Sequence, residues 1–409
     1  MEHLRLHPKF VPLPLPKDLP KLTNLEDVRN FRQDSWQWDA LHDGRCTTSQ
    51  AVAALGFIEP KVGQVLGVPP TWQRRGGIGV YNRLRQSALR TLEEMNEILL
   101  PYQNDIISDG KENDKMLANT TSSNSTKKLW KKCNANITAS SSAKAGRNNK
   151  QTNFAAKYLG KLSQKTKAER RRRAQMYANS GMGIRMMWGN AQEATSVLTA
   201  LNYFTKQVPG VVLKEIGMCG AGLDFNQTRD PATPSLLIGA TPDAVIEYPD
   251  GKIEALEVKN HCPFIVFSRE QNHRSKGAFS VRELPFQKPY IFPLYIPQLM
   301  LEMLCLGPTC RSAVMVRQTA TSGALILRIH RDDEWIVEML YWLKRFHRDF
   351  VEHEVEPPLN FFFESEQDGP RYRKFLERTK ELALQVDVVA RLPNKVIQRA
   401  AFTEPMFLD

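Results

Sequence analysis

The sequence predicts a mixed α/β fold, and two observations carry that prediction. The chain has 409 residues, of which 42% are apolar and 9% aromatic, which is enough to build a large core. From about residue 188 the hydrophobic periodicity changes in the order helix, three strands, helix, two strands, helix. We therefore expect a mixed β-sheet flanked by helices, an α/β (α+β) arrangement.

The N-terminal third is expected to supply helices and an arm. Residues 1–23 are proline-rich and predict an extended arm, with prolines at positions 8, 12, 14, 16 and 20. Residues 24–103 form the first part of the main domain, with helices predicted at 24–41, 48–55 and 84–100.

Residues 104–187 differ from their neighbours in charge and composition. They hold 18 Lys and Arg against 5 Asp and Glu, whereas the whole chain has a net charge of +12. A Ser, Thr, Asn and Lys tract over 119–152 has a single aromatic residue, so we expect a disordered, low-complexity insertion. The run Arg170 to Arg173 is typical of a phosphate-binding arm or a nuclear import signal, and a solvated linker is an equally good interpretation.

Residues 188–356 are predicted to form the central part of the domain, and 357–409 a C-terminal extension. The expected elements, in chain order, are a helix over 189–204, strands over 211–219, 236–248 and 253–259, a helix over 298–306, strands over 313–318 and 324–330, and an amphipathic helix from Asp332.

The sequence predicts a soluble, intracellular protein. No run approaches the roughly 18 apolar residues of a membrane span, and the N-terminus lacks the apolar stretch of a signal peptide. The six cysteines contain no C-x-x-C pair, so we expect free thiols rather than a zinc or redox site. If the source is eukaryotic, the arginine run also permits a nuclear location.

A predicted hairpin carries the most informative residues. Pro249-Asp250-Gly251 separates two β-branched runs, which is typical of a tight turn between antiparallel strands. A turn centred on Asp250 places Asp243 directly opposite Glu257. Because side chains alternate along a strand, Glu257 and Lys259 share one face. The hairpin therefore brings two carboxylates and an ammonium group to one place.

Two interpretations of that cluster remain open at this point. The carboxylates and the carbonyl oxygen of Val258 are ligands that Mg²⁺ prefers, and Lys259 could then orient or help deprotonate a water, or stabilise charge on a phosphate. The plainer interpretation is a cross-strand salt bridge between Lys259 and Asp243. Taken alone, the triplet favours the salt bridge.

Two polar residues on apolar helix faces favour the functional interpretation. Glu193 shares a helix face with Val197, Ala200 and Phe204. Gln298 opens an almost wholly apolar helix, where its amide needs a hydrogen-bond partner.

The chain resembles the PD-(D/E)XK nucleases, and within them the lambda exonuclease and YqaJ viral recombinase family. The resemblance extends over residues 36–350 and leaves out most of the arm, the insertion and the C-terminal extension. It depends on seven ordered motifs: Trp38-x-x-Leu41 to Gly44-Arg45-x-Thr47-x-Ser49, Trp188-Gly189-x-x-x-Glu193, Glu215, Thr241-Pro242-Asp243, Glu257-Val258-Lys259, Cys262-Pro263-Phe264 and Tyr295-x-x-Gln298.

The resemblance implies a restriction-endonuclease-like core and a metal-dependent deoxyribonuclease that digests linear duplex DNA from a 5′ end, in recombination or repair. It implies that Glu193, Asp243 and Glu257 hold two Mg²⁺ ions, for which Mn²⁺ can substitute. Lys259 would serve the attacking water, and Gln298 would position the substrate.

The resemblance also implies a site for the terminal 5′ phosphate. Ser49 and Thr241 match hydroxyls that bind this phosphate in the family. The family's arginine is replaced here by His42, and Arg45 is the candidate to supply the positive charge. A ring-shaped homotrimer and a single-strand annealing protein as partner are further expectations of the family.

Two other functions remain open on the sequence. The same fold supports structure-specific or single-strand endonucleases, since loops and oligomer geometry set end preference. A catalytically inactive protein that binds nucleic acid through the basic insertion is the second alternative.

Overall fold

The structure is a computed structural model. It describes residues 2–15, 18–19, 22–42, 44–85, 181–220, 236–265, 280–281 and 289–397. These residues all belong to one compact unit. The predicted insertion lies outside the described residues except for 181–187, as does a basic loop around residues 269–276.

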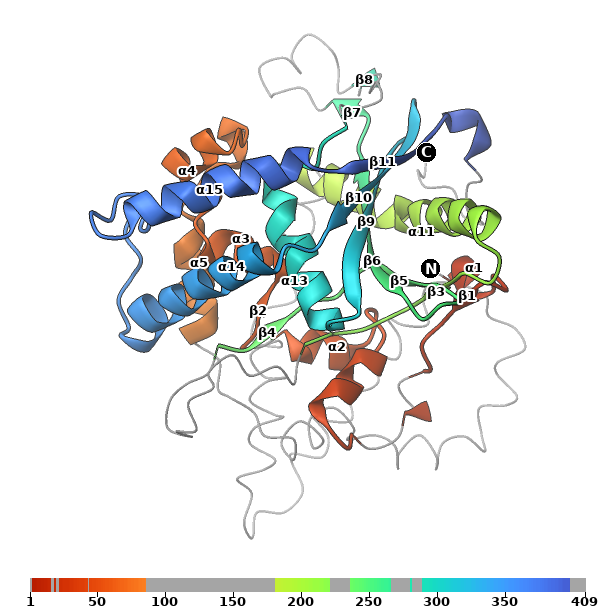
Figure 1. The fold of residues 1–409 in the computed structure, drawn as a ribbon, viewed down its shortest axis with the longest axis horizontal. Coiled ribbons are helices and arrows are strands. Elements are labelled where there is room, and N and C mark those ends of the chain that lie inside the picture. The colour runs from red at the N-terminus through yellow and green to blue at the C-terminus, as the bar shows by residue number, and fades with distance from the viewer. Residues whose placement is uncertain are drawn as a thin grey trace, which may run out of the picture. The chain divides into compact units, whose positions relative to one another are not determined.

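A seven-stranded mixed sheet forms the centre of this unit (Figure 1). Two of its strand pairs are parallel, β1 with β3 and β6 with β9, and the other pairs are antiparallel. In spatial order its strands are β1 (Phe10–Val11), β3 (Val212–Lys214), β5 (Ala244–Glu247), β6 (Ile253–His261), β9 (Cys310–Thr319), β10 (Gly323–His330) and β11 (Asp387–Leu392).

Helices cover both faces of this sheet, which confirms the predicted fold class. The long helix α11 (Gly181–Gln207) lies on one face (Figure 1). The opposite face is covered by α13 (Ile296–Leu306), with α3 (Thr48–Ala54), α14 (Asp333–Phe346) and α15 (Gly369–Leu384) packed around it.

The remaining elements are short. Two additional two-stranded sheets pair β2 (Cys46–Thr47) with β4 (Ile238–Gly239) and β7 (Phe264–Ile265) with β8 (Ser280–Val281). The other helical segments are α1 (Glu2–Arg5), η2 (Leu25–Asn30), α2 (Trp36–Leu41), α4 (Pro60–Val65), η3 (Pro70–Trp72), α5 (Gly76–Arg85), η4 (Pro293–Tyr295), η5 (His347–Glu352) and η6 (Asn394–Val396).

Side-chain alternation along β6 divides the core into two layers. Leu256 and Val258 are buried in the cluster that contains Val197 and Leu201 of α11. Ala255 is buried in the cluster on the α13 side. By the same alternation Glu257 and Lys259 point to the α13 side, so that face of the sheet carries the polar residues of the hairpin.

The N-terminal segment is part of the sheet, unlike the extended arm that its prolines predict. Residues before the prolines form α1, and β1 pairs in parallel with β3 through Phe10 opposite Leu213. Leu4 and Phe10 are buried in the α11 layer of the core. Burial of these two side chains and the pairing of β1 with β3 thus help to fix a segment that composition alone assigns to solvent.

The chain after residue 357 also belongs to the same core. Strand β11 pairs antiparallel with β10 and forms one edge of the large sheet. In α15, Phe375 stacks on Trp335 with ring centroids 5.0 Å apart, and Thr379 accepts a hydrogen bond from the Trp335 indole at 3.0 Å.

The helix predicted over 24–41 is interrupted, because two capping residues start two separate helices. Asn24 caps η2 and forms a reciprocal capping box with Asp27. Ser35 caps α2 by accepting a hydrogen bond from the amide of Trp38 at 3.3 Å. The break places Arg32, Gln33 and Asp34 in the turn between the two helices.

Candidate active site

The hairpin register agrees with the prediction from its turn. Ala244 pairs with Leu256, and the same register continued by one residue sets Asp243 opposite Glu257. The turn closes with a hydrogen bond from the amide of Gly251 to the Tyr248 carbonyl at 3.0 Å, and Gly251 has a φ of 84°, which favours glycine. Asp243 lies just before β5, at the end of the hairpin far from the turn.

Asp243 is tied to β6 by its carboxylate. Its Oδ2 accepts a hydrogen bond from the backbone amide of Val258 at 2.7 Å. This bond fixes the carboxylate beside Glu257 and Lys259, which flank Val258 in the sequence.

Lys259 forms an ion pair with Glu257, on its own strand, rather than the salt bridge with Asp243 that the plainer interpretation expected. Its Nζ atom also lies 5.3 Å from the centre of the Tyr295 ring, just before α13. Burial opposes the charge of Lys259, but Glu257 and Asp243 raise its pKa above the ordinary value. The lysine is therefore a cation at neutral pH.

The acidic residues at this place exceed the positive charge available to them. Burial and the neighbouring Glu257 raise the pKa of Asp243 well above its ordinary value, and they raise the pKa of Glu193 on α11 in the same way. Glu257 is 3% exposed, and its Oε2 has no hydrogen-bond partner among the described residues. One lysine therefore faces three carboxylates.

A second buried acid on β6 shows how a structural carboxylate is satisfied in this fold. Glu254 accepts hydrogen bonds from Arg328 at 2.8 and 3.0 Å and is also bonded by Ser312 and Tyr248. These partners lower its pKa in spite of its burial. Glu257 lacks such a set of partners, which indicates that its second oxygen is available to a ligand.

The carboxylate oxygens of Glu193, Asp243 and Glu257 are chemically suited to bind a hard divalent cation. Carboxylate oxygens are the preferred ligands of Mg²⁺, and a cation would relieve both the mutual repulsion of these acids and the unbonded Oε2 of Glu257. As the side chains stand, no three His, Cys, Asp or Glu residues within the described ranges are grouped closely enough to hold a metal ion. The carboxylates would have to turn toward one another on binding.

Gln298 lies on α13 next to this cluster, together with an acid that the sequence reading overlooked. Its Nε2 donates to Oε1 of Glu302 at 2.9 Å, one turn further along the helix. Glu302 is fully buried, and burial together with Glu257 raises its pKa well above the ordinary value. The spacing of four residues between Gln298 and Glu302, on an otherwise apolar helix, is the signal that could have identified it.

The residues predicted to bind a 5′ phosphate lie around Trp38. The indole of Trp38 donates to Oγ1 of Thr241 at 3.1 Å. The His42 ring packs edge-on against Trp38 with centroids 4.2 Å apart, and its Nδ1 donates to the Trp38 carbonyl at 2.9 Å. Since Thr241 is two residues from Asp243, this group adjoins the acid cluster.

Arg45 and Ser49 reach the same region through the small parallel sheet of β2 and β4, in which Thr47 pairs with Gly239. Arg45 is buried, and its Nη1 donates to the Leu41 carbonyl at 2.9 Å. Ser49 is exposed near the start of α3. The structure therefore brings three of the four predicted residues close together and leaves Ser49 at the surface nearby.

Arg83 of α5 joins this group, and nothing in the sequence near it indicates that role. Once its amide is oriented to satisfy both neighbours, Gln50 donates to the Arg45 carbonyl at 2.9 Å and accepts from Arg83 Nη1 at 2.8 Å. Burial lowers the pKa of His42, and the charges of Arg83 and Arg45 lower it further. His42 is therefore neutral at neutral pH, and both arginines lie close enough to act on it electrostatically.

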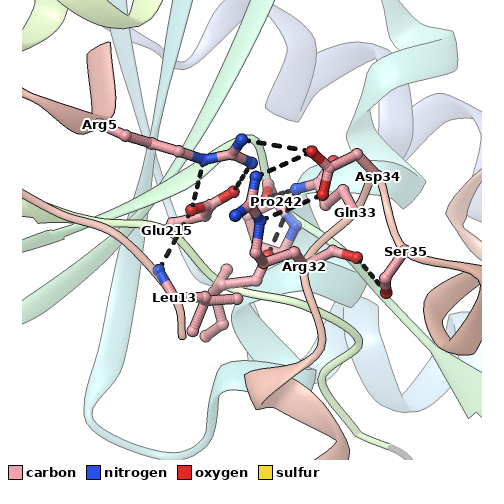
Figure 2. A network of polar contacts seen from close by, with 9 residues as sticks. Arg5, Leu13, Arg32, Gln33, Asp34, Ser35, Glu215 and Pro242 are labelled. Carbon is pink, nitrogen blue, oxygen red and sulfur yellow. Dashed lines mark hydrogen bonds and ion pairs between the residues drawn. The ribbon is translucent and has the colours of Figure 1, made fainter. Parts of the chain in front are cut away.

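A network of charged residues holds the N-terminal segment against the candidate site (Figure 2). Arg5 of α1 donates to both carboxylate oxygens of Glu215, with 3.1 Å from Nε to Oε2, and also pairs with Asp34 at 3.2 Å. The backbone amide of Leu13 donates to Glu215 Oε2 at 3.1 Å. Residues of the N-terminal segment thus donate hydrogen bonds to both carboxylate oxygens of Glu215, one of the motif residues.

The same network reaches the residue before Asp243. Gln33 donates from Nε2 to the Pro242 carbonyl at 2.9 Å and to the Ile216 carbonyl at 3.3 Å (Figure 2). The turn between η2 and α2 therefore fixes the backbone that carries Asp243.

The comparisons with known proteins find a structural likeness. Part of the chain is similar to the crystal structure of an alkaline exonuclease, LHK-Exo, from Laribacter hongkongensis, with a TM-score of 0.28 and 17% identity, covering 49% of this chain and 88% of that one. LHK-Exo in complex with dAMP gives a TM-score of 0.28 and 17% identity, with 48% and 87% covered. No protein-family model and no curated protein sequence matches the chain. Because the superposition is partial and the identity low, function has to be inferred from the side chains of the site.

Proposed function

We propose that the chain is a Mg²⁺-dependent deoxyribonuclease that hydrolyses linear duplex DNA from an end, in the 5′-to-3′ direction, in recombination or repair. One observation carries the proposal: Glu193, Asp243 and Glu257 lie near enough to act on one another electrostatically, beside one lysine, and a buried oxygen of Glu257 lacks a partner among the described residues. A purely structural site would pair its acids, as Glu254 is paired.

Glu193, Asp243, Glu257 and the carbonyl oxygen of Val258 would hold the metal ions. When bound, the ions would activate a water and neutralise charge on the scissile phosphate. Mn²⁺ is expected to substitute for Mg²⁺, because both accept oxygen ligands.

Lys259 would act as a positive charge and not as a base. Its raised pKa keeps it protonated, so it can donate a hydrogen bond to the phosphate or orient the attacking water. Asp243 is preorganised by the amide of Val258, which reduces the rearrangement needed when DNA binds.

The arginines beside Trp38 favour attack at an end over attack within a strand. A terminal phosphate carries more negative charge than an internal one. Arg45 and Arg83 lie close enough to His42 to act on it electrostatically, and His42 packs on Trp38, whose indole donates to Thr241, two residues before Asp243. The arrangement therefore fits an exonuclease that begins at a 5′-phosphorylated end.

The test is to incubate the protein with a linear duplex labelled at either end, with and without Mg²⁺. The wild type should release nucleotides from the 5′ end in Mg²⁺ and should be inactive in EDTA. Glu257→Gln and Lys259→Ala should each lower the rate by about 100-fold or more. Glu247→Gln, at the other end of the same hairpin and paired with Lys214, is the matched control and should keep full activity.

Other results would select a different function. Cleavage of closed circular DNA at a comparable rate would indicate an endonuclease. DNA binding without cleavage in Mg²⁺ or Mn²⁺ would overturn the proposal and leave a nucleic-acid-binding protein.

A further inference from the structure

The buried carboxylate of Glu302 on α13 requires an explanation beyond packing. Its side chain is 0% exposed among apolar neighbours that include Leu299 and Met303. Its Oε2 has no hydrogen-bond partner among the described residues, and Lys259, a cation that acts on it electrostatically, is paired with Glu257. A buried acid in this state destabilises a fold, and an apolar residue of similar volume would pack there at no such cost.

The hydrogen bond between Glu302 and Gln298 fixes the orientation of the Gln298 amide group. Oε1 of Glu302 accepts from Nε2 of Gln298 at 2.9 Å. Its other oxygen, Oε2, has no partner among the described residues, so the contact with Gln298 is the one hydrogen bond of this buried carboxyl group within the described ranges. The amide group of Gln298 is thereby held in one of its two orientations, with its nitrogen toward Glu302 and its carbonyl oxygen turned away.

The position of α13 makes that orientation relevant to the site. Tyr295, just before the helix, lies against Lys259, and Glu257 and Asp243 both act electrostatically on Glu302. Gln298 is in the first turn of the helix and is only partly buried, whereas Glu302 is one turn deeper. A partly exposed amide, one turn from the tyrosine that contacts Lys259, can therefore reach DNA at the proposed site, while the buried acid behind it cannot.

We propose that Glu302 is a positioning residue, which orients the Gln298 amide so that Gln298 presents its carbonyl oxygen to the water or to the DNA strand at the acid cluster. This inference rests on the proposed nuclease function. It goes beyond that function by assigning a second layer of residues behind the site. Glu302 contributes to the rate only through Gln298.

The experiment is a double-mutant cycle on the full chain, with Glu302→Met, Gln298→Ala and the combined variant, measured as cleavage of linear duplex in Mg²⁺. Methionine fills the same space but cannot accept a hydrogen bond, so Glu302→Met should be about tenfold slower or more. In the Gln298→Ala background the same change should alter the rate by less than about twofold, because the residue it acts through is absent.

Three controls separate positioning from folding. Glu302→Gln keeps an oxygen that can accept from Gln298 and should stay within about threefold of wild type. Met303→Leu, a volume-conserving change of the next residue on α13, should leave the rate unchanged. The thermal unfolding midpoint of Glu302→Met should equal or exceed that of wild type, since a buried acid has been removed.

Each alternative outcome identifies what failed. A wild-type rate in Glu302→Met overturns the inference and leaves the nuclease proposal intact. Losses that add in the combined variant, a lowered unfolding midpoint, or a Glu302→Gln variant as slow as Glu302→Met would show that the acid acts in packing or by its charge, which also overturns it. A wild-type protein that cuts no DNA defeats the proposed function itself.

Discussion

At the scale of single residues, the charge that meets a terminal phosphate would come from arginine and not from His42. Burial and the two neighbouring arginines lower the pKa of His42, so at neutral pH it is uncharged. Arg45 is buried and bonded to the Leu41 carbonyl, whereas Arg83 is an exposed residue whose Nη1 donates to Gln50. Arg83 is therefore the residue that can move toward an incoming phosphate.

We predict that Arg83→Met reduces the preference for 5′-phosphorylated ends. The variant should cut a 5′-phosphate duplex about tenfold more slowly, with a much smaller change on a 5′-hydroxyl duplex, because only the former carries the extra charge. The measurement is the ratio of the two rates. Arg85→Met is the matched control on the same helix, since Arg85 pairs at the surface with Glu354 and should not affect that ratio. An equal loss on both duplexes would count against a role in end recognition.

The sequence predicts part of the candidate site, and the reason is local. Asp243, Glu257 and Lys259 follow from one turn and the alternation of a strand, so their proximity needs no knowledge of the fold. Glu302 was missed because an acid in an apolar helix is easily taken for a surface position. Arg83 could not be found, because it joins the site through the packing of α5 against α3, and no local pattern encodes that contact.

At the scale of elements, the N-terminal segment is held by a buried ion pair. The side chain of Glu215 is 2% exposed and that of Arg5 is 12% exposed, so neither charge is well solvated. Removing one partner of such a pair leaves the other charge buried and costs more than removing both.

We predict that Arg5→Met lowers the free energy of unfolding by about 3 kcal/mol, because Glu215 then keeps only the amide of Leu13 as a partner. The Arg5→Met, Glu215→Met double variant should recover most of that loss. Denaturant unfolding of the three proteins checks the prediction, with Arg371→Met, which breaks a surface pair with Glu338, as the control. A double variant that is as unstable as the sum of the two single variants would contradict it.

The elements that the sequence predicts differ from those that it does not in how far their patterns extend along the chain. The helices and strands of the central region follow from long periodic patterns, and each has a counterpart in the structure, although α11 begins eight residues earlier than predicted and β3 is much shorter than the strand predicted over 211–219. The strand predicted over 236–248 is divided into β4 and β5, because the chain changes partner sheets before Asp243. Strands β1 and β11 have no such pattern. One has two residues and the other is largely exposed, and both are fixed by contacts with distant residues.

At the scale of the whole molecule, positive charge and the acid cluster are separated along the chain. Residues 104–187 carry a large excess of Lys and Arg, while the rest of the chain is nearly neutral. No helix within the described ranges is long and apolar enough to cross a membrane. If the chain is the proposed nuclease, its acidic centre would repel DNA until cations occupied it, so DNA binding and metal binding would be coupled.

The buried acids make the stability of the metal-free protein depend on pH, and Glu302 makes the folded state less stable as the pH rises. Its pKa in the folded state is raised above that in the unfolded chain, where a glutamate titrates near about 4.3. The folded state therefore binds the proton more tightly, and this stabilisation is complete below the unfolded pKa. It is lost progressively as pH rises through the folded pKa.

We predict that Glu302→Gln unfolds with the same midpoint as wild type near pH 4 and at a higher temperature than wild type near pH 8, both measured in EDTA. Glutamine is neutral at every pH, so the variant does not lose this stabilisation. The difference between the two midpoints should grow with pH over this interval. A difference that stays constant with pH would mean that Glu302 titrates in the folded protein as it does in the unfolded chain, and that its burial is relieved by solvent.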